Sequence, residues 1–127
     1  MDQTELCYLT ADEAISEFKA KKLSPVELID AVIDRTEHVD TEINAFTYTF
    51  FDQAREAAKI AEKKYVNIEE TGELEGLPIG VKDESGIIGQ PLSKGSLIYT
   101  IPNNKIYYNL SLFFFNYQPF TINFFHQ

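Results

Sequence analysis

One lysine in this sequence stands where a side chain could do chemistry. Lys82 follows the apolar run Leu77 to Val81 and precedes a segment rich in glycine and proline. A charged residue at the end of a buried strand occupies the position where α/β folds place their functional sites. A lysine side chain acts as a base near neutral pH only when burial lowers its pKa. The pattern is also typical of a surface cation, and taken alone it favours the surface cation.

The other chemically versatile side chains have no comparable placement. His38 falls near a predicted helix end and His126 near the last residue, and neither has the spacing of a metal ligand. Cys7 is the only cysteine, so no internal disulfide is possible, and it fits a small packed hydrophobe. The glycines after Lys82 lack a phosphate-binding spacing. We therefore expect neither a metal nor a cofactor.

A cluster of acidic residues precedes the apolar run. Paired carboxylates can perform acid–base catalysis, but only where an apolar surrounding shifts their pKa. Nothing apolar surrounds this cluster in the sequence, which predicts a solvated loop. Its members are Glu69, Glu70, Glu73 and Glu75.

Two capping boxes predict the first helices. Thr10 and Glu13 have the spacing in which each side chain satisfies a free backbone donor, and an apolar face follows them. Ser24 and Glu27 repeat the spacing with proline at the first helical position, which predicts a second helix ending near residues 38–40.

The elements nearest the lysine are a helix and a strand. Residues 43–50 alternate aromatic and threonine side chains, which indicates a short strand or an extended linker. Residues 52–65 predict a third helix, whose many alanines indicate close packing against a neighbour. The run from Leu77 predicts the start of a buried strand that ends at Lys82.

The charge of the chain limits its partners. A formal net charge of -9 and a pI of about 4.6 disfavour binding to nucleic acid or to anionic lipid, because both require clustered Lys and Arg. The first residues lack the basic and apolar segments of a secretory signal peptide. No stretch of 18 apolar residues occurs, so we expect no membrane-spanning helix. We expect a cytoplasmic protein that binds neither membranes nor nucleic acid.

The composition changes abruptly after Ser96. All 20 acidic residues lie at or before Glu84, and Lys105 is the only charged residue of the tail, which is rich in Phe, Tyr, Asn and Ile. These residue types have AT-rich codons, so we interpret the tail as translated intron or frameshifted sequence. A pair of aromatic core strands or a membrane-surface segment is the alternative, although a surface segment normally carries more basic residues.

The segment around the lysine resembles a known family. The run Gly76 to Asp83, read Gly-Leu-Pro-Ile-Gly-Val-Lys-Asp, is similar to the first signature segment of the amidase signature family, which delivers the catalytic lysine. Three further segments resemble that family in the correct order: Leu23 to Leu28, Ile43 to Phe46, and Gly89 to Pro91 followed by Gly95 and Ser96. The resemblance covers roughly residues 9–98.

The resemblance implies a Ser–cis-Ser–Lys triad with Lys82 as the proton acceptor. In this family one serine attacks an amide carbonyl, a second serine relays the proton, and the lysine accepts it and helps to protonate the leaving amine. A cis non-proline peptide costs about 3–4 kcal/mol, so only a rigid surrounding retains it. Backbone donors beside the nucleophile would supply the oxyanion hole.

The chain departs from the family pattern at two places. The Gly/Ser-rich segment that carries both serines of the family has no counterpart here, and Ser85, Ser93, Ser96 and Ser111 stand in other contexts. Ser85 reads as a loop hydroxyl. The paired threonines of the loop are replaced by Leu92 and Ser93. We therefore assign Lys82 as the one catalytic residue and assign no nucleophile.

These observations predict an α/β fold with the N-terminal helices and the first strand or strands of the family's mixed sheet, which would be incomplete. Residues 1–98 are expected to form the N-terminal part of an amidase signature domain, and residues 99–127 an aromatic tail of doubtful foldedness. The expected function is that of a truncated amidase-type hydrolase, whose parent acts on a small-molecule carboxamide. The alternatives are a non-catalytic helical interaction module and a fragment of a glutamine-dependent tRNA amidotransferase subunit.

Overall fold

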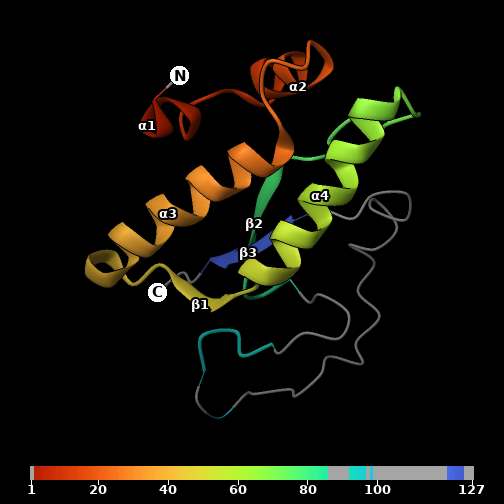
Figure 1. The fold of residues 1–127 in the computed structure, drawn as a ribbon. Helices are drawn as coiled ribbons and strands as arrows, with labels where there is room; N and C mark the ends of the chain where they lie inside the picture. The colour runs from red at the N-terminus through yellow and green to blue at the C-terminus, as the bar shows by residue number, and fades with distance from the viewer. Residues whose placement is uncertain (1, 86–91, 97, 99–119, 125–127) are drawn as a thin grey trace.

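The computed structural model describes residues 2–85, 92–96, 98 and 120–124, the last range by its backbone (Figure 1). Four helices and three strands follow one another along these residues. In chain order they are α1 (Gln3–Leu6), α2 (Ala11–Lys19), α3 (Pro25–Ile43), β1 (Phe46–Thr49), α4 (Phe51–Asn67), β2 (Pro78–Lys82) and β3 (Phe120–Phe124).

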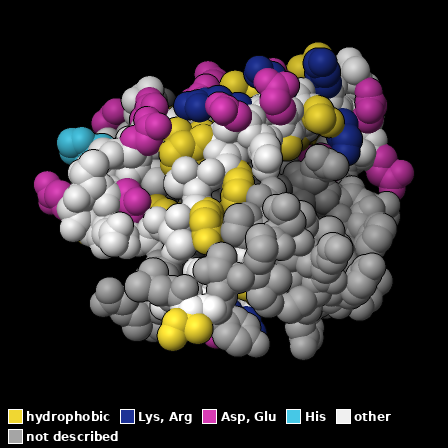
Figure 2. Space-filling view, turned by 90° about the horizontal axis from the view of Figure 1, so that it is seen from below, with side chains coloured by type: hydrophobic (Ala, Val, Ile, Leu, Met, Phe, Trp, Pro, Cys, Tyr) yellow, Lys and Arg dark blue, Asp and Glu magenta, His cyan; other side chains and the backbone are white. Residues whose placement is uncertain are grey.

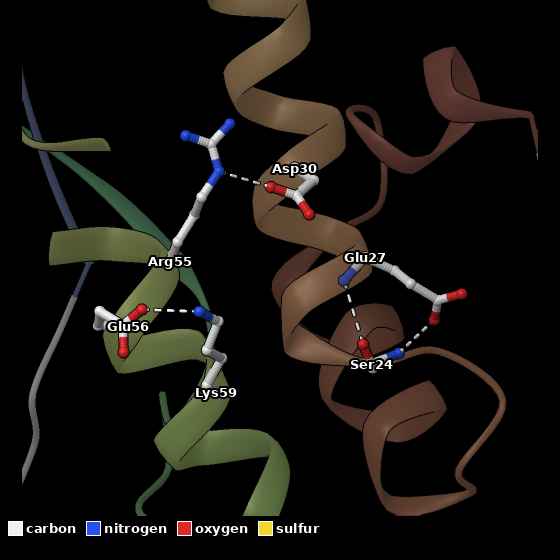
Figure 3. Close-up of polar contacts among 6 residues, drawn as sticks. All are labelled: Ser24, Glu27, Asp30, Arg55, Glu56 and Lys59. Carbon is white, nitrogen blue, oxygen red and sulfur yellow. Dashed lines mark hydrogen bonds and ion pairs between the residues drawn. The ribbon is translucent and has the colours of Figure 1, made fainter. Parts of the chain in front are cut away.

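Both predicted capping boxes are present. The hydroxyl of Thr10 accepts a hydrogen bond from the backbone N–H of Glu13, and the Glu13 carboxylate accepts one from the Thr10 N–H. The Thr10 N–H and the Thr10 hydroxyl both donate to the Glu13 carboxylate, and they hold the pKa of Glu13 below its ordinary value. Ser24 and Glu27 form the same pair at the start of α3, with N···O distances of 3.1 and 2.8 Å (Figure 3). The predicted helix starts are therefore confirmed.

Helix α3 runs beyond its predicted end. It continues to Ile43, and Asn44 then adopts a left-handed backbone with φ of 48°. Asn is one of the few residues that tolerate this conformation. The carboxylate of Asp40 accepts hydrogen bonds from the backbone N–H groups of Ala45 and Phe46, at 2.6 and 3.2 Å. The Asp40 carboxylate thus fixes the exit of the chain into β1.

The alanines of α4 pack closely against α3, as predicted. Ala54, Ala58 and Ala61 are buried against Ile29 and Ile33. Small side chains on one helix let the larger side chains of the other fit into its grooves. Asp30 and Arg55 join the same two helices at 2.8 Å (Figure 3), although both are partly exposed, so the pair adds about 0–1 kcal/mol.

A second core cluster joins α2, α3 and the end of α4. Phe18 of α2 lies at its centre with 1% of its surface exposed, and its ring meets that of Tyr65 at a centroid distance of 5.5 Å. The cluster also holds Leu6, Ala14, Leu23, Leu28, Ala31 and Leu77. Leu77 connects this core to the first residue of β2, so the packing of the helices determines where the lysine strand begins.

The sheet is mixed, and its order is β1-β3-β2. β3 is antiparallel to β1 and parallel to β2, with Lys82 opposite Phe124 in the register. α3 packs on β2 and α4 packs on β3, as Figure 1 shows. The predicted α/β fold with a mixed sheet is therefore confirmed.

The central strand lies where the sequence analysis named core strands only as an alternative. β3 lies in the tail, which was expected to be of doubtful foldedness, and its backbone pairs with both other strands. Residues 99–119 and 125–127 lie outside the described residues. The division into 1–98 and 99–127, and the origin of the tail, therefore stay predictions. None of the helices described in the structure is long and apolar enough to cross a membrane.

Candidate functional site

Lys82 is the last residue of β2, where the sequence placed it. Val81 is buried and Gly80 is exposed, so the strand has one face toward the core and one toward solvent. The Lys82 side chain is 48% exposed, and its Nζ lies 3.0 Å from Oε1 of Glu84, which is also exposed. In the described part of the chain Lys82 is thus a cation in a surface ion pair. Its assignment as a catalytic base stays a prediction.

Asp83, to which the sequence analysis assigned no role, is buried next to Lys82. Only 3% of its surface is exposed, although Lys82 beside it is half open to solvent. Its carboxylate accepts hydrogen bonds from the backbone N–H and the hydroxyl of Ser93 and from the N–H of Gly95. The lysine strand is therefore tied at its end to the loop of residues 92–96. The Lys-Asp pair of the signature run was a signal for this role.

Among the described residues, the other chemically versatile side chains that the sequence analysis considered have no role at the site. Ser85 is half-buried in the turn after β2, where its N–H donates to the Lys82 carbonyl at 2.8 Å, which agrees with a loop residue. Cys7 donates its thiol to the Ala31 carbonyl, and burial raises the pKa of the Cys7 thiol. His38 is exposed on α3, and His126 lies outside the described residues. No group of His, Cys, Asp and Glu in the described ranges has the arrangement of a metal site.

Three members of the acidic cluster are exposed, but Glu75 is buried. The prediction of a solvated loop is therefore wrong for Glu75. Glu75 is 5% exposed, and both of its carboxylate oxygens lie 3.0 Å from Nζ of Lys64. The Tyr65 hydroxyl donates to the Glu75 carbonyl at 2.9 Å, and burial raises the pKa of Tyr65. The last turn of α4 supplies both partners, and sequence spacing gave no sign of this contact.

Gly76 links the buried Glu75 to the lysine strand. Its φ of +86° lies in the region that favours glycine. A Cβ built at this position would lie 2.9 Å from Cγ of Pro25 and 3.3 Å from Cε2 of Phe18. The chain therefore passes against the start of α3 at a distance that only glycine permits.

Replacing Gly76 by alanine is expected to lower the free energy of unfolding by at least about 1–2 kcal/mol, because the left-handed backbone alone costs that much. The contact with the rigid ring of Pro25 adds to this loss. Urea unfolding followed by circular dichroism measures the change. Gly80→Ala is the matched control, because Gly80 is exposed in β2. Equal stabilities of the two variants would contradict the interpretation.

Comparison with known proteins places the chain among amidases. The model of the family described as "Amidase" matches residues 27–105, a range that contains Lys82 and Asp83. The A subunit of the glutamyl-tRNA(Gln) amidotransferase of Anaeromyxobacter dehalogenans (strain 2CP-C) is 38% identical over 94 residues, which cover 74% of this chain and 19% of that protein. The protein of the same name from Brucella anthropi is 40% identical over 80 residues, which cover 63% of this chain and 16% of its own length.

A solved structure agrees with these matches. The crystal structure of a bacterial aryl acylamidase of the amidase signature family superposes with a TM-score of 0.80 and 25% identity, over 94% of this chain and 26% of that one. This chain thus spans about a sixth to a quarter of the length of the relatives that it matches. The family predicted from the signature run is confirmed, and the chain belongs to the amidase family, the amidase signature enzymes.

Proposed function

We propose that this chain carries the catalytic lysine of an amidase-type hydrolase that cleaves the C–N bond of a small-molecule carboxamide. The observation that carries the proposal is the position of Lys82. It ends β2 inside the segment matched by the amidase family model, directly before a buried aspartate that ties the strand to the following loop. In α/β folds functional side chains collect at strand ends of this kind.

The proposed mechanism is the Ser–cis-Ser–Lys triad. A serine forms a bond to the amide carbonyl carbon, its proton passes through the second serine to the lysine amine, and the lysine returns a proton to the departing nitrogen. The half-exposed side chain of Lys82 has to be enclosed before it can serve as a base, because burial is what favours a neutral amine. We assign neither serine in this sequence, so residues 1–127 alone are expected to show no amide hydrolysis.

The proposed partners follow from the surface charge. In the view of Figure 2, the Lys and Arg side chains of the described part are interspersed with Asp and Glu. This face of the described residues offers a polyanion no separate basic patch to bind. We propose a small amide substrate as the ligand of the whole enzyme, without nucleic-acid or membrane binding, and a location in the cytoplasm.

A chimeric enzyme tests the proposal. Residues 9–98 of this chain would replace the corresponding segment of the bacterial aryl acylamidase, and hydrolysis of an aryl acylamide would be followed by release of the arylamine. We expect measurable turnover, and a loss of about 10²–10⁴-fold in kcat on Lys82→Ala, the range of a general base. The base acts only in the chemical step, so KM should change little.

The control variant is Lys63→Ala, which removes an exposed lysine from α4 and should leave kcat unchanged. A chimera with the parent's circular dichroism but no turnover would contradict the proposal. Turnover that survives Lys82→Ala would contradict it as well, because the base would then be another residue.

A second candidate function is that of a glutamine-dependent tRNA amidotransferase component. The amidotransferase relatives are 37–40% identical to this chain, compared with 25% for the aryl acylamidase. In that role the nitrogen that leaves is ammonia from glutamine. A second chimera, built in the Anaeromyxobacter amidotransferase, separates the two candidates. The kcat/KM of each chimera is compared with that of its unmodified host enzyme. The host type that retains the larger fraction of its kcat/KM is the type to which this chain belongs.

A further inference from the structure

The carboxylate of Asp83 is the most completely enclosed charge beside the lysine. Burying a carboxylate is costly unless donors replace its water, and the donors named for Asp83 come from two residues of one loop. The loop turns tightly at this point, because Lys94 and Gly95 both have positive φ, at 52° and 70°. The Ser96 N–H closes the turn on the Ser93 carbonyl at 2.9 Å. The loop is also anchored to the core, because Leu92 is buried.

We call the hydrogen-bonded unit of Asp83 and the loop of residues 92–96 the clamp. In the sequence, Asp83 lies between the two partners of the lysine's ion pair. Lys82 and Glu84 each adjoin Asp83, and their side chains meet in solvent at 3.0 Å while the carboxylate between them points into the protein. Fixing Asp83 therefore fixes the two peptide bonds from which the paired side chains extend. The Ser85 N–H donates to the Lys82 carbonyl and closes the same turn.

We propose that Asp83 and Ser93 are positioning residues that set the direction of the Lys82 amine. Neither acts on substrate: the Asp83 carboxylate holds the end of β2 and the loop of residues 92–96 together, and Lys82 extends from this fixed base. The inference rests on the proposed function of Lys82. It goes further by assigning a role to the serine that stands in place of one of the family's paired threonines.

The test measures the placement of Lys82 in the full 127-residue chain without any amide substrate. Trace acetylation by acetic anhydride, read by mass spectrometry, gives the reactivity of Lys82 relative to Lys63 of the same molecule. Ser93→Ala removes the hydroxyl donor and should raise this ratio about two- to fivefold. A factor of this size corresponds to the strength of the exposed ion pair that the Lys82 amine would lose. Ser93→Thr keeps the hydroxyl and should return the ratio to that of the unmodified chain.

Asp83→Asn is the stronger variant, because its amide NH₂ would face the donors of the loop. It should raise the ratio at least as far as Ser93→Ala. If it unfolds the chain, all lysines become reactive together, and the Ser93 pair of variants decides the result. An unchanged ratio in Ser93→Ala, or an equal rise in Ser93→Thr, would overturn the positioning role.

Kinetics in the chimera keep this inference separate from the proposed function. Ser93→Ala should lower kcat with KM unchanged, and Ser93→Thr should restore kcat. If Lys82→Ala abolishes turnover while Ser93→Ala leaves kcat intact, the positioning role fails and the catalytic role of Lys82 stands. If Lys82→Ala leaves turnover intact while the acetylation ratio responds as expected, the clamp stands and the proposed function fails.

Discussion

Replacing Phe18 by alanine is expected to lower the free energy of unfolding by about 3–5 kcal/mol, the cost of emptying a packed aromatic site. The ring is 1% exposed, meets Tyr65, and approaches the backbone of Gly76, so three segments lose contacts together. The total free energy of unfolding of a small domain is about 5–15 kcal/mol. The variant should therefore melt far below the unmodified chain, or lose its cooperative transition.

Urea unfolding followed by tyrosine fluorescence and by circular dichroism measures this loss. Tyr8→Ala serves as the control, because Tyr8 is also aromatic but 72% exposed, and surface changes usually stay within about 0.5 kcal/mol. A Phe18→Ala variant that falls within about 1 kcal/mol of the control would mean that the helices do not pack around this ring.

Lys64→Met is expected to lower the free energy of unfolding by about 3 kcal/mol, because it leaves the buried carboxylate of Glu75 without its cation. We expect the lower end of the range for broken buried pairs, since Lys64 is 29% exposed and water can reach its partner in part. The Gly72 N–H, at 3.4 Å from the Glu75 carboxylate, would remain as a donor. The change should depend little on salt, because a buried pair is weakly screened.

A double-mutant cycle checks this result. Lys64→Met combined with Glu75→Met removes both charges and should be closer in stability to the unmodified chain than either single variant. Lys63→Met is the neighbouring control on the exposed side of α4 and should be nearly neutral. Additive losses in the double variant would show that the two charges do not stabilise each other.

Local sequence signals predicted α2, α3, α4 and the start of the lysine strand, whereas the short helix α1 was not predicted. A capping box joins residues three apart, so the pairs at Thr10 and Ser24 could be identified without any tertiary contact. The alanines of α4 likewise indicated a close neighbour before that neighbour was known to be α3. The apolar run that begins at Leu77 then placed Lys82 at the end of a buried strand, which is β2.

Contacts between distant segments could not be predicted in the same way. Glu75 is buried because Lys64 reaches it from α4, and Asp83 because Ser93 folds back on it. Neither partner stands at a spacing that has a recognised local meaning. A strand in the tail was only an alternative for the same reason: the strand state of β3 depends on pairing with β1 and β2, and the tail shows no sustained alternation.

The strand order has a consequence for synthesis on the ribosome. Of the three described strands, β3 is made last and lies between the other two, so β1 and β2 leave the ribosome before the strand with which they both pair. Translation at about 5–20 residues per second leaves them open for roughly seconds, much longer than strands take to find each other. During that interval the nascent chain exposes strand edges that other chains can join, and its yield in a cell depends on what shields them.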